Sequence, residues 1–226
     1  MESENLLPAK PHAQESSKLP RILLATRNRH KTREIQTMLG EGVIITDATQ
    51  IEGLPEIEET GITFEENSKL KAEGISRVIE GMVLADDSGL EVDALGKEPG
   101  VYSARYASLG SSTDSGAGST DEMNTALVLA KMGGVPSEKR TARFRCVLAV
   151  AEHGKTLAVF DGTVEGILAT EVRGDGGFGY DPIFIPLYEG GYHKTFGELS
   201  SDIKHTISHR SRALAQFKEW WARRGL

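Results

Sequence analysis

One short segment, Ala85-Asp86-Asp87-Ser88-Gly89, constrains the fold of this 226-residue chain more than any other. It follows the apolar residues 82–85, which have the character of the end of a buried strand. Two carboxylates at a strand end place anionic oxygens at the rim of a sheet, where open α/β sheets bind their ligands. Hard oxygen ligands of this kind suit Mg²⁺. The alternative interpretation is a tight turn with two solvated aspartates, because strand ends are rich in turn residues.

The composition is that of a globular protein, with 38% hydrophobic and 26% charged residues. A chain of this size buries a sizeable core without disulfides or a structural metal. Its single cysteine, Cys146, lies in an apolar run and is predicted to be a core residue of a strand. One cysteine forms no disulfide framework, which indicates a reducing compartment, and we expect a cytoplasmic protein.

The ends and the charges of the chain limit the classes of partner that we expect it to bind. Residues 1–19 are polar and contain prolines, so we expect a flexible extension followed by one folded domain over residues 20–226. No apolar run approaches the ~18 residues that span a bilayer, and we expect no membrane partner. The net charge of −7 argues against nucleic-acid binding. Basic residues nevertheless cluster at 27–33 and 204–212, which indicates a small anionic ligand.

The order of predicted elements is mixed, which favours an α/β domain with some antiparallel strands. Strands are expected at 21–25, 43–45, 82–85, 141–151 and 156–164, with 90–94 continuing the third strand beyond a kink. Helices are expected at 29–39, from an N-cap at Thr63 to about residue 79, at 121–132, and over 201–223 without a break. Residues 52–61 form an acidic loop, and 106–120 a mobile loop rich in Ser, Gly and Thr.

The segment Thr26-Arg27-Asn28-Arg29-His30-Lys31 joins the first strand to the first helix. A helix N-terminus presents unpaired N–H groups and a partial positive charge, which suits a phosphate group. The alternative is an ordinary N-cap followed by a solvated basic helix face.

Two further segments carry candidate binding residues. In Gly177-Phe178-Gly179-Tyr180-Asp181-Pro182, glycines allow close backbone approach and the aromatic rings offer stacking area for a base. The last helix carries Ser208-His209-Arg210, and Lys204 lies four residues before Ser208 on the same face. The alternatives are a glycine-rich turn with core aromatics and a solvated helix face.

Taken together, these segments resemble the Ham1/inosine triphosphate pyrophosphatase family. The resemblance covers about residues 21–222, and six motifs occur in the family's order. They are Thr26-x-Asn28-x-x-Lys31, Phe64-x-Glu66-Asn67-x-x-x-Lys71-Ala72, Ala85-Asp86-Asp87-Ser88-Gly89-Leu90, Pro99-Gly100-Val101-Tyr102-Ser103-Ala104-Arg105-Tyr106, Gly177-Phe178-Gly179-Tyr180-Asp181-Pro182 and Ser208-His209-Arg210. The chain departs from the family in its N-terminal extension and in the long loop 107–120.

The resemblance implies two lobes around a long mixed twisted sheet with flanking helices, a substrate cleft between the lobes, and a homodimer. It implies hydrolysis of purine nucleoside triphosphates with non-standard bases (ITP, dITP, XTP and dXTP) to monophosphate and pyrophosphate. The resemblance assigns catalysis to Asp87 and Lys31. It assigns Mg²⁺ binding to Asp87 and Glu58, with Glu59 and Asp86 as less favoured ligands. The implied substrate-binding residues are Thr26, Arg27, Asn28, Arg29, His30, Lys31, Ser88, Phe178, Gly179, Tyr180, Asp181, Lys204, His209 and Arg210.

Two other hypotheses stay open at this point. One is a nucleotide-binding regulator without catalysis, against which the retained Asp87 and Glu58 argue. The other is a pyrophosphatase of broader nucleotide range, because nothing in the sequence shows how guanine is rejected.

Overall fold

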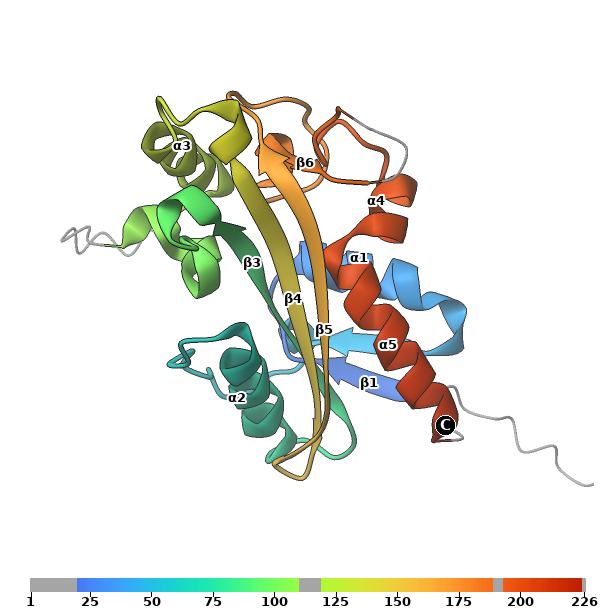
Figure 1. The fold of residues 1–226 in the computed structure, drawn as a ribbon. Coiled ribbons are helices and arrows are strands. Elements are labelled where there is room, and N and C mark those ends of the chain that lie inside the picture. The colour runs from blue at the N-terminus through green and yellow to red at the C-terminus, as the bar shows by residue number, and fades with distance from the viewer. Residues whose placement is uncertain (1–19, 110–118, 189–192, 225–226) are drawn as a thin grey trace, which may run out of the picture.

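The computed structural model describes residues 20–109, 119–188 and 193–224, and these fold around one six-stranded sheet (Figure 1). The expected extension 1–19 lies outside the described residues. The strand order is β2-β1-β3-β4-β5-β6, in which β1 runs parallel to β2 and β3 while the other neighbouring pairs are antiparallel. The strands are β1 (Arg21–Leu24), β2 (Ile44–Asp47), β3 (Val83–Val92), β4 (Thr141–Glu152), β5 (Lys155–Leu168) and β6 (Phe184–Pro186). The predicted mixed α/β class is confirmed.

Helices cover both faces of the sheet (Figure 1). They are α1 (Arg29–Leu39), α2 (Phe64–Ser76), α3 (Asp121–Lys131), α4 (Ser201–Ile207) and α5 (His209–Arg223). One apolar cluster lies between the sheet and α1 with α5, and a second lies under α2 on the opposite face. A third fills the other end of the long strands, beside α3, β6 and α4. The long strands β3, β4 and β5 therefore join two lobes.

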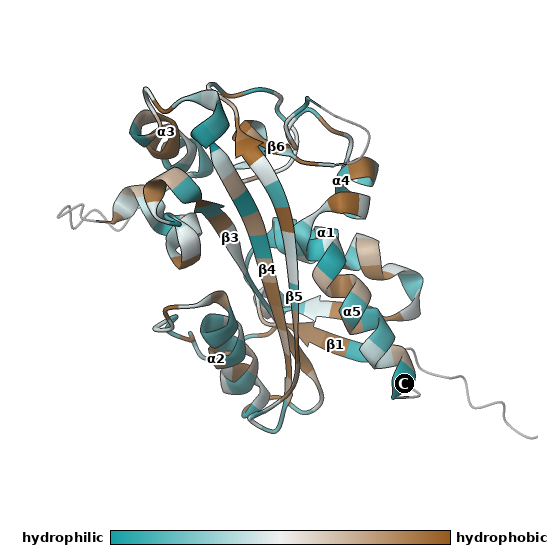
Figure 2. Ribbon diagram, in the orientation of Figure 1, coloured by the Kyte–Doolittle hydropathy of each residue, from teal (hydrophilic) through white to brown (hydrophobic). Residues whose placement is uncertain are grey.

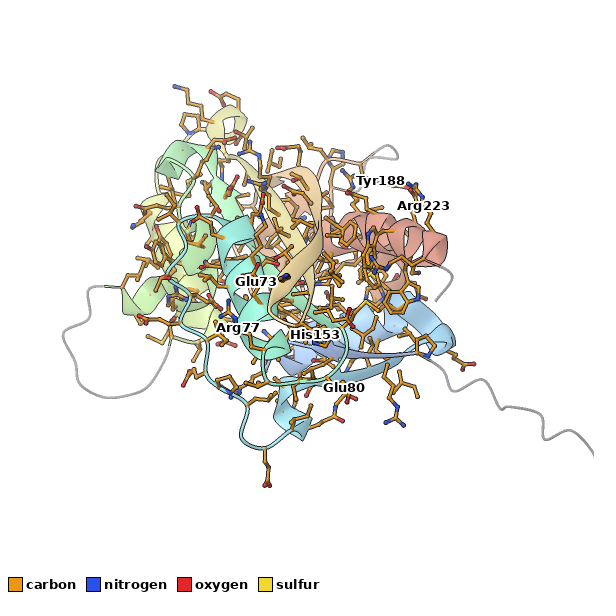
Figure 3. The ribbon with its side chains drawn as sticks, turned by 90° about the horizontal axis from the view of Figure 1, so that it is seen from below. Glu73, Arg77, Glu80, His153, Tyr188 and Arg223 are labelled. Atoms are coloured by element: carbon orange, nitrogen blue, oxygen red, sulfur yellow. The ribbon has the colours of Figure 1, made fainter. Side chains whose placement is uncertain are left out.

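The hydropathy of β4 changes along its length (Figure 2). In its first half, arginines alternate with other residues, whereas residues 146–151 are apolar and buried. Cys146 is fully buried, which confirms the prediction that it is a core residue of a strand. The end of α2 is fixed to the β4–β5 turn, where Figure 3 shows Glu73 and Arg77 near His153. There Thr156 donates a hydrogen bond to Glu73 at 2.6 Å. The end of α2 is thus tied to the turn of the β4–β5 hairpin.

The strand that carries the paired aspartates was predicted wrongly. β3 is one continuous ten-residue strand paired with β4 from Val83 to Val92, so Asp86 and Asp87 lie in its middle rather than at its end. No kink interrupts it, because β4 supplies antiparallel partners along the whole length. Gly89 is needed there for close approach, since a Cβ would lie 2.3 Å from the Ser103 hydroxyl. The two aspartates consequently project to opposite faces of the sheet.

The last helix was also predicted wrongly as continuous. Ser208 has an extended backbone (φ −70°, ψ 161°), which ends α4 and begins α5. Its hydroxyl caps α5 by accepting a hydrogen bond from the Ser211 N–H at 3.2 Å. Gly162 of β5 lets the start of α5 approach the sheet, because a Cβ would lie 2.1 Å from the His209 carbonyl oxygen. The break, rather than a shared helical face, brings Lys204 near His209.

Smaller differences concern the ends of elements. α2 begins with the predicted capping box of Thr63 and Glu66 but ends at Ser76, three residues earlier than expected. The expected loop at 106–120 begins only after a 3₁₀ helix, η4 (Gly100–Ser108), and residues 110–118 lie outside the described part. Within the described residues, no helix combines the length and apolar character needed to cross a membrane.

Candidate active site

A charged cleft lies where β1, α1, α2, β3 and η4 meet. Carboxylates and cations face one another across it, and its lining includes Arg27, Lys31, Glu56, Glu59, Lys71, Asp86, Asp87 and Arg105. Its cavity volume is about 280 Å³. A second, aromatic pocket adjoins it, lined among others by Phe144, Phe178, Tyr180, Asp181, Lys204, His209 and Arg210. Asn28, Lys31, Ser88 and Ala104 line both, so the two form one continuous site.

Asp87 is the carboxylate of the cleft that keeps a free oxygen. Its Oδ1 accepts a hydrogen bond from Lys71 of α2 at 2.7 Å, whereas its Oδ2 is buried with no hydrogen-bond partner among the described residues. Burial raises the pKa of Asp87, and the ammonium groups of Lys71 and Lys31 only partly oppose this. A buried carboxylate with an unused oxygen and increased basicity is suited to accept a proton or bind a cation.

Asp86, the neighbouring residue, is fully paired on the other face of β3. It accepts hydrogen bonds from Lys31 at 2.6 Å, Arg210 at 2.8 Å and Ser88 at 2.8 Å. Burial opposes ionisation of Asp86, but Arg210 and Lys31 more than offset it and hold its pKa well below the usual range. Asp86 is therefore a structural anion that positions two cations.

The start of α1 is capped by side chains of the turn that precedes it. The Asn28 side chain caps α1 by accepting hydrogen bonds from the backbone N–H groups of His30 at 2.9 Å and Lys31 at 3.3 Å. The Thr26 hydroxyl accepts one from the Asn28 N–H at 3.1 Å. Thr26, Asn28 and Lys31 all line the charged cleft. The predicted N-cap is confirmed. The anion site stays a prediction, because the capped N–H groups of His30 and Lys31 are already paired, and it depends on Lys31, which lines the cleft.

The two adjacent glutamates of the acidic loop are placed differently. Glu59 lines the charged cleft, where Lys71 lies at 3.3 Å and Arg105 at 3.3 Å. Burial opposes ionisation of Glu59, but Lys71 and Arg105 lower its pKa overall. Glu58, the residue favoured from the sequence as a metal ligand, is exposed and faces a neighbouring groove shared with Arg105. The structure thus brings Glu59, rather than Glu58, towards Asp87.

The donor set of the cleft fits a magnesium ion. The described residues contain no group of three or more His, Cys, Asp or Glu side chains arranged to hold a metal. Mg²⁺ in nucleotide sites is commonly bound by one or two carboxylates together with water and substrate phosphates, so a full protein cage is not required. The Lys71 ammonium already lies between Asp87 and Glu59, and the free Asp87 Oδ2 offers a further position for positive charge.

In the aromatic pocket, the glycine-rich loop presents one ring and buries another. Phe178 is half-buried, with the Lys204 ammonium 4.8 Å from its ring centroid. Tyr180 also lines the pocket but belongs to the core, where its hydroxyl donates to the Ser103 carbonyl at 2.8 Å. Gly177 has φ +74°, and a Cβ there would lie 2.0 Å from the Asp181 carboxylate. Phe178 is accordingly the ring available for stacking.

Buried ion pairs fix the cations of this pocket. Lys204 contacts Asp181 at 2.6 Å and Glu34 of α1 at 2.6 Å, and Glu34 also contacts Arg210 at 2.5 Å. With the Arg210–Asp86 pair, the charges alternate from the glycine-rich loop to the middle of β3. Burial raises the pKa of Asp181 despite the ion pair with Lys204. The alternating pairs hold Lys204 and Arg210 against the pocket in fixed positions.

His209 is buried and uncharged. Burial, with Arg210 and Lys204 nearby, lowers its pKa well below the usual value. Its ring stacks on Phe144 at a centroid separation of 4.8 Å, and its Nδ1 has no hydrogen-bond partner among the described residues. The imidazole thus forms part of the pocket wall, and its unpaired Nδ1 is itself buried.

Two residues of the basic segment diverge from this site. Arg27 is exposed but still lines the charged cleft. Arg29 faces a separate groove with Arg33 on the outer side of α1. His30 lines neither the cleft nor the pocket but stacks on Phe178. The predicted set 26–31 is therefore split between the site and its surroundings.

Three residues of the site were not predicted as functional from the sequence: Glu34, Lys71 and Arg105. Lys71 had a detectable signal, because it lies on the face of α2 that otherwise buries Ser68, Ala72 and Ile75. Glu34 lies one turn beyond Lys31, and Arg105 comes from the far lobe, so their contacts depend on tertiary structure.

Known proteins share both the sequence and the fold. The sequence profile of the Ham1 family matches residues 22–220. A dITP/XTP pyrophosphatase of Geobacillus kaustophilus (strain HTA426) is 47% identical over 201 residues, covering 88% of this chain and 93% of that protein. One of Bacillus subtilis (strain 168) is 46% identical over 198 residues, covering 87% and 94%. Both relatives are matched over nearly their whole length.

Solved structures agree with this relationship. A HAM1 protein from Coxiella burnetii superposes with a TM-score of 0.76 at 37% identity, covering 90% of this chain and 99% of that one. The Ham1 protein of Staphylococcus aureus gives a TM-score of 0.74 at 37% identity, covering 89% and 98%. Sequence, fold and the order of the site motifs thus lead to one conclusion: this chain belongs to the Ham1 family.

Proposed function

We propose that this protein hydrolyses purine nucleoside triphosphates with non-standard bases, namely ITP, dITP, XTP and dXTP, to the monophosphate and pyrophosphate. The observation that carries the proposal is the continuity of the charged cleft with the aromatic pocket through Asn28, Lys31 and Ser88. A triphosphate fits the first and a purine the second. The relatives named dITP/XTP pyrophosphatases support the same reaction.

Asp87 is the proposed general base, because its Oδ2 is free and its pKa is raised. A carboxylate that is more basic than usual takes the proton of an attacking water more readily, which contributes about 10²–10⁴-fold to the rate. Lys31, with the partial positive charge at the N-terminus of α1, offsets negative charge on the phosphates as the bond breaks.

Mg²⁺ is the proposed cofactor, held by Asp87 together with Glu59. When bound, it neutralises phosphate charge and polarises the phosphorus–oxygen bonds. Glu59 replaces Glu58 in this assignment because only Glu59 lines the cleft beside Lys71. Lys71 holds both carboxylates in place and keeps them close despite their repulsion.

Base selection is proposed to follow from hydrogen-bond polarity in the aromatic pocket. Phe178 stacks on the purine, and Lys204, His209 and Arg210 line the same pocket. Hypoxanthine and xanthine carry a 6-keto oxygen that accepts hydrogen bonds, whereas the 6-amino group of adenine donates them. Donors in the pocket would face that amino group unpaired, so ATP is disfavoured.

The experiment compares the consumption of ITP, dITP, XTP, ATP, GTP and UTP at equal concentration with Mg²⁺, with products separated by chromatography. Fast conversion of ITP, dITP and XTP and slow conversion of ATP and GTP supports the proposal. Similar rates for all six would support a pyrophosphatase of broad range. Binding of ITP without conversion would support a non-catalytic regulator.

The homodimer stays a prediction of the family resemblance, and the cytoplasmic location stays a prediction from the single cysteine. A homodimer is expected to give twice the mass of the chain in light scattering after gel filtration. A monomer at micromolar concentration would contradict it without affecting the proposed reaction.

A further inference from the structure

His30 makes a contact that the charged cleft does not explain. Its imidazole stacks on the ring of Phe178 with centroids 5.2 Å apart and an interplanar angle of 21°. This geometry falls in the range of offset-stacked aromatic pairs. In the described part of the chain, the imidazole makes no hydrogen bond or ion pair. The stack on Phe178 is therefore the interaction that can give this side chain a role.

The contact brings together Phe178, which lines the aromatic pocket, and His30, which does not. Phe178, Lys204 and Arg210 line that pocket, and His30 does not. The Lys204 ammonium and the Arg210 guanidinium carbon lie 4.8 and 5.8 Å from the Phe178 centroid. The ring is thus contacted by an imidazole from α1 and by two cations from α4 and α5.

His30 also belongs to the proposed phosphate-binding turn. Its backbone N–H donates to the Asn28 side chain at 2.9 Å, and the next residue is Lys31. Phe178 comes from the glycine-rich loop, 148 positions further along the chain, where the adjacent glycines give the backbone little intrinsic stiffness. The backbone of the loop is held by Asp181, which accepts the Phe178 N–H at 2.9 Å, and by Asp121, which accepts the Gly179 N–H at 2.7 Å. The contact from the capped end of α1 therefore acts on the Phe178 ring rather than on the loop backbone.

We propose that His30 is a positioning residue for base recognition: its imidazole stacks on Phe178 and holds that ring for stacking on the purine. The proposal rests on the proposed function and assigns His30 no contact with the substrate. It links the turn that binds phosphate to the ring that stacks on the base.

The kinetic test compares His30→Ala, His30→Phe and Arg33→Ala on ITP. Because aromatic pairs contribute modestly, His30→Ala should raise KM about two- to tenfold with kcat nearly unchanged. His30→Phe keeps a ring in place and should restore the wild-type KM. Arg33→Ala is the matched control, because Arg33 lies one turn further on α1 and faces a separate groove. An unchanged KM in His30→Ala would overturn the proposal.

A double-mutant cycle separates support of Phe178 from contact with the base. If His30 acts through Phe178, His30→Ala should have no further effect on KM in a Phe178→Ala background. A multiplicative effect in that background would overturn the proposal, because His30 would then act independently of the ring.

Inorganic tripolyphosphate separates the base from the phosphates, because it carries no base. Its inhibition constant should be unchanged in His30→Ala and raised in Lys31→Ala. A parallel rise in both variants would mean that His30 only shapes the phosphate-binding turn, which would contradict the proposal.

An NMR measurement that needs no turnover distinguishes failure of the His30 proposal from failure of the proposed function. The imidazole proton resonances of His30 should move when Phe178 is replaced by Leu, because the ring current is lost. Unchanged resonances would overturn the stack itself. Failure of the wild-type protein to convert ITP would instead count against the proposed function.

Discussion

Asp86 and Asp87 are adjacent in the sequence, yet they occupy opposite environments on the two faces of β3. Asp86 faces α1 and α5, where Lys31, Ser88 and Arg210 satisfy its oxygens. Asp87 faces α2, where Lys71 binds one oxygen and the other is unpaired. Their pKa values move in opposite directions, down for Asp86 and up for Asp87.

The difference lies in how much positive charge each face supplies to offset burial. Both side chains are desolvated, so burial alone would raise both pKa values. Two cations outweigh it at Asp86, whereas Lys71 is shared with Glu59 and does not outweigh it at Asp87. A fully paired carboxylate maintains structure, and an incompletely paired one is available for chemistry.

The largest expected effect is the loss of activity in Asp87→Asn. Asparagine keeps the shape but removes the charge and the basicity, so kcat for ITP should fall by at least about 10²–10⁴-fold. ITP binding should persist in calorimetry, and the melting temperature should stay within a few degrees. Turnover within a few-fold of wild type would mean that another carboxylate is the general base, and it would contradict the proposed difference between Asp86 and Asp87.

Asp86→Asn should instead unfold the protein more easily. Breaking a buried ion pair costs about 3–5 kcal/mol, because the partner charges stay buried without compensation. For a chain of this size, that lowers Tm by about 6–20 °C, measured by circular dichroism. A variant that melts like wild type but is inactive would make Asp86 a catalytic group and contradict the assignment.

The variants Glu59→Gln and Glu58→Gln test which of the two glutamates binds Mg²⁺ together with Asp87. Replacing a ligand should weaken the apparent Mg²⁺ affinity by about 10–100-fold or more, because loss of a supporting partner already has an effect of this size. We therefore expect a raised Mg²⁺ requirement in Glu59→Gln and an unchanged one in the exposed neighbour Glu58→Gln. The reverse result would restore the ligand predicted from the sequence.

The smallest effect is a difference in the pH dependence of stability. A carboxyl group whose folded pKa is raised contributes stability at low pH that is lost as the pH rises through the folded pKa, as at Asp87. A lowered pKa, as at Asp86, contributes stability above the unfolded value of 3.8 that is lost as the pH falls through the folded pKa. At pH 7 the unfolding free energy of wild type should therefore be lower than that of Asp87→Asn. The difference should shrink as the pH falls towards 4. A constant difference over this range, in urea titrations, would contradict the raised pKa.

Local signals predicted most of the fold. Asn28 and the capping box of Thr63 and Glu66 set the helix starts where they were expected, and the two paired strands β4 and β5 lie close to the expected ranges 141–151 and 156–164. The uninterrupted β3 and the break at Ser208 were missed. Pairing with β4 overrides the turn propensity of Asp-Asp-Ser-Gly, and close packing of α5 on Gly162 redirects the chain.

The site was predicted less completely than the fold. The candidates Asp87, Lys31, Phe178 and Lys204 do line the joined cleft and pocket, but the order of motifs could not distinguish Glu58 from Glu59. That choice depends on which side chain the loop turns towards Lys71. The role of Glu34 depends on contacts with residues 170 and 176 positions away, which no local pattern encodes.

The most direct test of the account is ³¹P NMR of dITP hydrolysis by wild type and Asp87→Asn at equal protein and Mg²⁺ concentrations. With wild type, the triphosphate signals should be replaced by those of a monophosphate and pyrophosphate, and with Asp87→Asn they should persist. Orthophosphate and a diphosphate from wild type, or pyrophosphate release by Asp87→Asn at a near wild-type rate, would contradict it.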